Sequence, residues 1–205
     1  MLGVIDIMKL MIDSNKDRSH VSDYFAETAA ICKSINKRKI DDLVHALIEL
    51  RIREGRLFFL GLGGSAANCS HMVNDFRKIG HMECYSISDN IAELTARAND
   101  DGFDTIYSEW LKTSKLSGND AIFVCSVSGG GPQNSLPLVK AIDYAKTIGA
   151  KIYGVCGKSQ GYLNTEGDIV ILVPNICSRR VTAHSEGFQM IISHCIVNHP
   201  HFQQI

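Results

Sequence analysis

After residue 55, short apolar runs alternate with segments whose apolar residues recur at helical spacing. The predicted strands cover residues 57–60, 83–87, 121–125, 151–156 and 169–173. The helical segments between and after them cover 66–78, 91–98, 104–111, 135–148 and 183–197. Nearly continuous apolar strands that alternate with helices are typical of a parallel sheet covered on both faces. The sequence therefore predicts an α/β fold with a parallel five-stranded sheet flanked by helices.

Before the first strand, from about residue 5 to residue 50, the pattern is helical and carries no strand signal. The apolar residues at helical spacing are Ile7, Leu10, Met11, Val21, Tyr24, Phe25, Ala29, Cys32, Ile40, Leu43, Ala46, Leu47 and Leu50. Helices that precede the first strand cannot be crossovers of the sheet, so they pack on its flank or on another subunit. We favour the second arrangement. Residues 1–205 are then one domain, with oligomerisation helices over 1–54 and an α/β core over 55–205.

Length and charge exclude several classes of protein. The chain has 205 residues, 45% of them hydrophobic, and a formal net charge of -1, so it has no basic field to hold a nucleic acid. Its apolar runs are too short for a membrane span, and its first residues lack the basic flank of a secretory signal. We therefore expect a cytoplasmic protein without nucleic-acid or membrane partners. The scattered cysteines form no CxxC motif, which indicates reduced thiols: Cys32, Cys69, Cys84, Cys125, Cys156, Cys177 and Cys195.

Two of the predicted strands run directly into loops of glycine and serine. The first strand ends at Gly61-Leu62-Gly63-Gly64-Ser65, and the third ends at Cys125-Ser126-Val127-Ser128-Gly129-Gly130-Gly131. Such loops bring backbone N–H groups, hydroxyls and a helix N-terminus to the carboxyl edge of a parallel sheet, where anions bind. Neither loop carries the lysine of a P-loop. The sequence therefore predicts one phosphate held by hydroxyls and amides.

Two other interpretations of the first loop stay open. Residues 61–66 also satisfy the pattern G-x-G-x-x-A, and Asp89 follows the next strand at the distance of a ribose-binding acid, so a dinucleotide site is one alternative. The other alternative is that the glycines only allow tight turns between strand and helix. Neither interpretation explains the second loop, where three consecutive glycines carry a conformational cost unless another group must approach closely.

Ionisable residues occur as two pairs on predicted helices. His71 and Asp75 are one turn apart on the helix after the first loop, and Glu186 and His194 are just over two turns apart on the last helix. Two histidines and two carboxylates in this arrangement are suited to a metal site or to acid–base chemistry on a sugar. Taken singly, each pair is also compatible with solvated side chains on a helix face.

Taken together, these motifs resemble the sugar isomerase (SIS) domain family and, within it, the phosphoheptose isomerases. The resemblance covers nearly the whole chain. It is carried by Gly63-Gly64-Ser65, His71-Met72-Val73-Asn74-Asp75, Ser86-Ile87-Ser88-Asp89, Asn99-Asp100, Ser126-Val127-Ser128-Gly129, Asn134-Ser135, Val173-Pro174, Glu186 and His194.

The resemblance implies a flavodoxin-like SIS fold, a homotetramer with a central bundle of N-terminal helices, and active sites at subunit interfaces. It implies a ketose–aldose isomerase, most closely one for sedoheptulose 7-phosphate, that works through an enediol without a nucleotide cofactor. The residues it assigns to substrate binding are Ser65, Asp100, Ser126, Ser128, Ser135 and Glu186. The proton-transfer residues are Asp75 and His194, and the zinc ligands are His71, Asp75, Glu186 and His194.

The chain also departs from the family pattern. The usual asparagine of the first loop is Leu62, the threonine between the serines is Val127, and residues 130–133 are an insertion. Asp75 replaces a glutamate and is one methylene shorter, which favours metal ligation over direct proton transfer, and Glu186 replaces a glutamine. The alternative function is a non-catalytic SIS module, either a phosphosugar sensor or an adaptor of the bacterial replication initiator. The four ionisable residues argue against it.

Overall fold

The computed structural model describes residues 14–203, with side chains from residue 19, and its centre is a five-stranded parallel sheet. The strands are β1 (Leu57–Gly61), β2 (Cys84–Tyr85), β3 (Ala121–Ser126), β4 (Lys151–Cys156) and β5 (Ile169–Leu172). Their order across the sheet is β2-β1-β3-β4-β5, and every neighbouring pair is parallel. The predicted α/β fold is confirmed. The predicted Ile7, Leu10 and Met11 lie outside the described residues.

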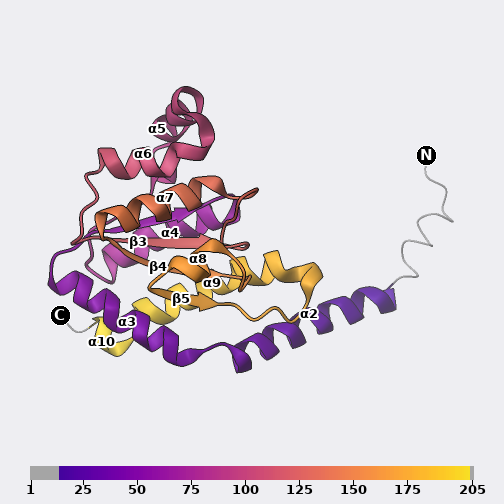
Figure 1. The fold of residues 1–205 in the computed structure, drawn as a ribbon. Helices are drawn as coiled ribbons and strands as arrows, with labels where there is room; N and C mark the ends of the chain where they lie inside the picture. The colour runs from indigo at the N-terminus through magenta and orange to yellow at the C-terminus, as the bar shows by residue number, and fades with distance from the viewer. Residues whose placement is uncertain (1–13, 204–205) are drawn as a thin grey trace.

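The helices connect and cover these strands (Figure 1). Those that match predicted segments are α4 (Gly64–Lys78), α5 (Ile91–Arg97), α6 (Ile106–Thr113), α7 (Leu136–Ile148) and α9 (Val181–Val197). The structure adds the short helices α8 (Tyr162–Glu166) and α10 (Pro200–Gln203) and the turns η1 (Ile87–Asp89), η2 (Ala98–Gly102), η3 (Phe103–Thr105) and η4 (Ser178–Arg180). None of the helices within residues 14–203 combines the length and apolarity needed to cross a membrane.

Two apolar clusters fill the two faces of the sheet. On one face, α4 and α9 pack with a third helix, α3 (Lys37–Ile52), against the side chains of Phe59, Phe123 and Val155. On the other face, α6, α7 and α8 cover Phe58, Ile122 and other residues that alternate with them along the strands. The central strands β1 and β3 are therefore buried on both sides, which is why they are apolar at successive positions, whereas Tyr85 on the edge strand β2 is exposed.

The two N-terminal helices behave differently. The apolar stripe of α3 packs on the flank of this chain's own sheet, the first of the two arrangements considered, and its buried residues complete the core: Ile40, Leu43, Val44, Leu47 and Leu50. The preceding helix, α2 (Ser14–Ser34), extends away from the sheet (Figure 1). Its Val21 and Phe25 are 56% and 67% exposed. α2 therefore carries exposed apolar side chains of the kind expected at a subunit contact, and Ile52 at the end of α3 is also exposed.

An ionic cluster joins α2 to the start of α9. The Glu27 carboxylate accepts hydrogen bonds from the Arg180 guanidinium, one of them from Nε at 2.8 Å, and lies 2.9 Å from Nε2 of the buried His184. The ring of Tyr24 stacks on His184 with 4.5 Å between centroids. Hydrogen bonds from Arg180, and to a smaller extent from His184, lower the pKa of Glu27 to about 2. The cluster fixes the direction in which α2 leaves the domain.

The strand order creates a topological switch point between β1 and β3. These strands are neighbours, with Gly61 opposite Cys125, but the chain leaves β1 towards β2 and leaves β3 towards β4 on the other side. The two connections therefore diverge and leave a crevice at the carboxyl ends of the strands, where ligands bind in folds with this order. The two loops of glycine and serine begin at this crevice.

Candidate functional site

The two serine-containing loops enclose a cleft of about 300 Å³ at the switch point. Its lining comes from both loops and from two further segments of the chain: Leu62, Ser65, Cys125, Ser126, Val127, Ser128, Ser135, Lys158 and Thr182. The four serines predicted to bind phosphate all line this one cleft. The structure thus brings together residues that are up to 70 positions apart in the sequence.

The second loop is shaped by hydrogen bonds of its own serines. Ser126 Oγ accepts the N–H of Gly129 at 3.0 Å, and Ser128 Oγ accepts the N–H of Gly130 at 3.2 Å. Gly129 and Gly130 have φ of 74° and 80°, a conformation that is strained for residues with a side chain. Gly129 and Gly130 therefore allow a tight turn in the second loop, and this turn lies beside the cleft that Ser126 and Ser128 line.

Tyr107 anchors the start of the first loop. Its buried hydroxyl donates to the carbonyl oxygen of Gly61 and accepts the N–H of the same residue at 3.2 Å. Burial raises the pKa of Tyr107, so the phenol stays protonated and remains a donor. The end of β1, and with it the position of the following loop, is thereby fixed by a side chain of α6.

A buried glutamine links the first loop to α9. Gln189 Nε2 donates to Ser65 Oγ at 3.0 Å, and Gln189 Oε1 accepts from Asn68 Nδ2 at 2.8 Å. Gln189 has no exposed surface. Gln189 was not among the predicted site residues, because its only signal in the sequence is a polar side chain at an otherwise apolar position of the last helix. The link sets the register between α4 and α9.

His71, Asp75 and His194 meet further along the same pair of helices. Nε2 of His71 and Nε2 of His194 lie 3.2 and 3.3 Å from Asp75 Oδ2, and the two nitrogens are 3.3 Å apart. Asp75 is buried, whereas the histidines are half exposed. Asn74 Nδ2 donates to the other oxygen of Asp75 at 3.0 Å. Three of the four predicted metal ligands therefore form one cluster.

The spacing of these three atoms fits a zinc ion. Zinc binds nitrogen and oxygen ligands at about 2.0–2.1 Å, so the ligand atoms of a tetrahedral site are about 3.3–3.4 Å apart. The observed distances of 3.2–3.3 Å match this value. A set of three protein ligands leaves the fourth position free for a substrate or water, as in catalytic rather than structural zinc sites. The buried carboxylate also supplies the negative charge that a cation requires.

Two predicted site residues, Glu186 and Asp100, lie outside both the serine cleft and this cluster. The Glu186 carboxylate lies against Gly64, so close that a Cβ on that residue would be 2.7 Å from the carboxylate carbon. Within residues 14–203, its side chain makes no hydrogen bond or ion pair, and it does not belong to the group of His71, Asp75 and His194. Asp100 lies in η2, where its carboxylate accepts from Asn99 Nδ2 at 2.7 Å, and it does not line the serine cleft.

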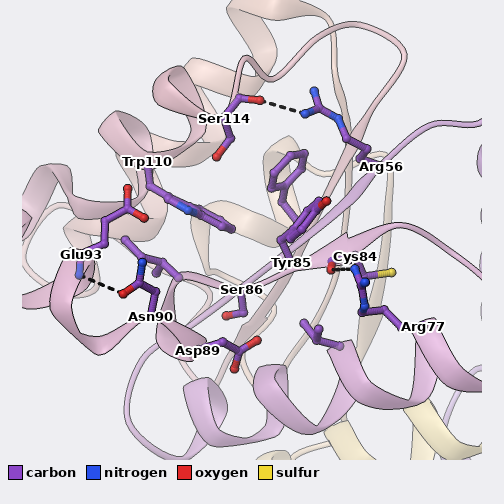
Figure 2. Close-up of a pocket in the computed structure, with 13 residues that line it drawn as sticks. Arg56, Arg77, Cys84, Tyr85, Ser86, Asp89, Asn90, Glu93, Trp110 and Ser114 are labelled. Atoms are coloured by element: carbon purple, nitrogen blue, oxygen red, sulfur yellow. Dashed lines mark hydrogen bonds between the residues drawn. The ribbon is translucent and has the colours of Figure 1, made fainter.

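A larger cavity, of about 540 Å³, lies at the β2 edge of the sheet (Figure 2). Its two arginines already have partners: Arg56 is paired with Asp120, and Arg77 donates to the carbonyl oxygen of Cys84. Asp89, the acid of the dinucleotide interpretation, lines this cavity rather than the serine cleft. The acid and the two serine-containing loops are therefore not parts of one site.

Comparison with known proteins agrees with this architecture. Residues 23–157 match the model of the SIS domain family. The chain is 30% identical over 187 residues to the phosphoheptose isomerase of Mycobacterium tuberculosis, with 85% of this chain and 90% of that protein covered. It is 27% identical to the phosphoheptose isomerase of Helicobacter pylori, with 86% and 93% covered. The structure of phosphoheptose isomerase from Neisseria gonorrhoeae has the same fold, with a TM-score of 0.77, 20% identity and 88% of this chain and 97% of that chain covered.

Proposed function

The chain belongs to the SIS domain family and is a phosphosugar isomerase of the aldose–ketose type, and we propose that it interconverts sedoheptulose 7-phosphate and a heptose 7-phosphate. One structural feature supports an isomerase rather than a phosphosugar sensor. A hydroxyl-lined cleft at the N-terminus of α4 and a cluster of His, Asp and His further along α4 and α9 are held in one register by Gln189. An isomerase needs both parts, whereas a phosphosugar sensor needs only the first.

The separation of the two parts supports a long-chain sugar. Ser65 and His71 are six residues apart on α4, which corresponds to about 9 Å along the helix axis. A seven-carbon chain has six C–C bonds of about 1.5 Å each, and its bond angles make the extended chain shorter than the sum of these lengths. With the phosphate ester added, its length is close to this separation. A three-carbon sugar phosphate is too short to reach from the cleft to the cluster.

In the proposed complex, the phosphate lies among Ser65, Ser126, Ser128 and Ser135. Hydroxyl groups and loop amides donate to its oxygens and hold one end of the substrate in place. The phosphate does not change during the reaction, so these contacts stabilise the ground state and the transition state equally. Asp100 and Glu186 remain proposed contacts to the sugar hydroxyls.

Asp75 and His194 are the proposed proton-transfer residues. Isomerisation moves one proton between C1 and C2 and one between the two oxygens, and it passes through an enediol. A carboxylate accepts the proton from carbon, and an imidazole next to it moves a proton between the oxygens. Asp75 and His194 lie 3.3 Å apart, so both can face the same two carbons of a substrate.

His71, Asp75 and His194 are also the proposed zinc ligands, because the spacing of their ligand atoms fits the ion. Bound there, zinc would polarise the carbonyl and stabilise the developing negative charge on its oxygen. Ligation would occupy Asp75 Oδ2 and His194 Nε2. Asp75 Oδ1 accepts a hydrogen bond from Asn74, so Glu186, whose carboxylate has no ion-pair partner in residues 14–203, is the proposed alternative base for the proton at carbon.

The proposal includes assembly and location. The exposed apolar residues of α2 support a homo-oligomer, which we propose to be a tetramer built around these helices. The cytoplasmic location expected from the sequence remains part of the proposal.

A direct assay tests the substrate assignment. Purified protein is incubated with sedoheptulose 7-phosphate in deuterium oxide, with zinc and with a chelator. We expect an aldose 7-phosphate product that carries deuterium at the carbon next to the carbonyl, because an enediol exchanges its proton with solvent. Fructose 6-phosphate and dihydroxyacetone phosphate serve as shorter substrates. Equal or faster turnover of the three-carbon substrate would contradict the proposed length of the site.

A further inference from the structure

We propose that Lys158 is a phosphate-binding residue that supplies the positive charge of the serine cleft. The inference rests on the proposed function, because it adds a ligand to the same phosphate site. Neither serine-containing loop contains a lysine. Lys158 comes from a third loop, residues 157–161 after β4, and lines the cleft together with the four serines.

Backbone hydrogen bonds hold this third loop on the second serine loop. At its start, the N–H of Gly157 donates to the carbonyl oxygen of Val127 at 3.0 Å. Just after its end, the N–H groups of Tyr162 and Leu163 donate to the carbonyl oxygens of Gly130 and Gly129 at 3.0 and 2.8 Å. The two loops are therefore joined at both ends, and Lys158 has a fixed backbone position beside Ser126 and Ser128.

Close packing reinforces this position. A Cβ on Gly157 would lie 2.0 Å from Ser185 Oγ, and a Cβ on Gly161 would lie 2.2 Å from the carbonyl oxygen of Ser128. Both ends of the third loop are thus in contact with neighbouring segments and have no room for a side chain. The exposed Lys158 therefore extends from a backbone that is packed on both sides of it.

The charges around the cleft point to an anionic ligand. Among the residues that the structure describes, Lys158 is the only charged one in the lining of the cleft. Within residues 14–203 it has no ion-pair partner, whereas Lys140, Lys146 and Lys151 on the same half of the domain are paired with Asp104, Glu166 and Asp168. A phosphate monoester carries about 1.5 to 2 negative charges near neutral pH. Hydroxyls and amides alone leave this charge uncompensated, and a lysine ammonium supplies both charge and donors.

A calorimetric titration of the protein with inorganic phosphate tests the proposal. A charge-assisted hydrogen bond contributes enough for Lys158→Met to weaken phosphate binding by about 10- to 100-fold. Lys158→Arg keeps the charge, so we expect it to retain most of the affinity. Lys151→Met is the matched control, because Lys151 begins the strand that Lys158 follows and therefore lies at the opposite edge of the sheet. The control should bind phosphate like the wild type.

Kinetics with the sugar phosphate give a second readout. Because the phosphate contacts are the same before and after the proton transfer, Lys158→Met should raise KM by a similar factor and change kcat by no more than about twofold. Thermal unfolding of each variant shows whether the fold is retained.

The outcomes separate this inference from the proposed function. If wild type and Ser126→Ala differ in phosphate affinity but Lys158→Met binds like the wild type, the assignment of Lys158 is wrong and the serine cleft stands. If Lys151→Met loses as much affinity as Lys158→Met, the effect is one of general surface charge, and the assignment is also wrong. If the wild type does not bind phosphate at millimolar concentration, the phosphate cleft itself is overturned.

Discussion

Asp75 contacts two imidazoles through a single oxygen, so its substitution tests the chemistry of the cluster directly. Asp75→Asn and His194→Gln each keep the size of the side chain and remove its capacity to accept or carry a proton. We expect each variant to retain phosphate binding and to lose kcat by about 10²- to 10⁴-fold, the usual effect of removing an acid or base. Full activity of both variants would refute the assignment.

Zinc content is a separate prediction for the same residues. Protein purified without chelator should contain about one zinc per chain, because three converging ligands with tetrahedral spacing are sufficient for a catalytic site. Loss of a residue that only hydrogen-bonds to a metal ligand typically weakens metal binding about 10- to 100-fold. His71→Ala removes a ligand itself, so it should weaken zinc binding by a larger factor. His45→Ala, at an exposed histidine of α3, is the control and should keep its zinc. Elemental analysis measures both variants, and a metal-free wild type that stays active with chelator would exclude the metal site.

Glu186 distinguishes the two roles proposed for Asp75. If Asp75 is only a zinc ligand and Glu186 is the base, Glu186→Gln should lower kcat about 10²- to 10⁴-fold with zinc retained. If Asp75 is itself the base, Glu186→Gln should mainly raise KM. Measurement of kcat, KM and zinc content on one preparation separates the two cases.

At the scale of whole elements, the register of α4 against α9 depends on Gln189. Gln189→Leu leaves Ser65 Oγ without its donor and Asn68 without one of its acceptors. We expect the free energy of unfolding to fall by about 1–3 kcal/mol, the usual effect of unpaired buried polar groups. The exposed Gln203→Leu is the control, and a change within about 0.5 kcal/mol is expected there. Equal stability of the Gln189 variant and the wild type would show that packing alone sets the register.

The strands and the long helices of the core could be predicted from the sequence, because burial on both faces gives continuous apolar runs in a parallel sheet. The strand around residue 84 is shorter than predicted, since the chain turns into η1 directly after Ser86. The partner of α3 could not be predicted: an apolar stripe shows that a helix face is buried but not which surface covers it.

The candidate site was predictable only in part. The serines and the His–Asp pair were visible because glycine-rich loops and helical spacing are local patterns. Lys158 and Gln189 were missed because their roles depend on contacts between segments far apart in the sequence, Lys158 with the second serine loop and Gln189 with Ser65. Glu186 carries a suitable side chain, yet its position against Gly64 is set by the approach of two helices.

For the whole molecule, the attachment of α2 should depend on pH. The pKa of Glu27 is about 2 in the folded protein against an ordinary value of 4.5, since Arg180 and His184 hydrogen-bond to its carboxylate. A lowered pKa stabilises the folded state above pH 4.5, and this contribution is lost as the pH falls from 4.5 towards 2. Glu27→Gln should therefore lower the unfolding temperature at pH 7 and flatten its decline below pH 4.5. Identical acid profiles of variant and wild type would contradict this.

Assembly is the remaining property at this scale, and it depends on the face of α2. Val21 and Phe25 are one helical turn apart and therefore share a face, and both are more than half exposed. The cluster of Glu27, Arg180 and His184 holds this helix away from the sheet, so the face is not covered by its own domain (Figure 1). Exposed apolar faces of this kind are usually covered by association, and closed symmetric assemblies are the commonest outcome.

Because the resemblance to phosphoheptose isomerases implies a homotetramer, we expect light scattering of the wild type at micromolar concentration to give the mass of a tetramer. Phe25→Asp places a charge in the proposed contact and should shift the protein to smaller species. Ile91→Asp, at an exposed position of α5 at the other end of the domain, should leave the mass unchanged (Figure 1). If the active sites lie at subunit interfaces, Phe25→Asp must also lower activity, although it touches neither the serine cleft nor the cluster of His71, Asp75 and His194. A monomeric wild type with full activity would contradict both the assembly and the shared site.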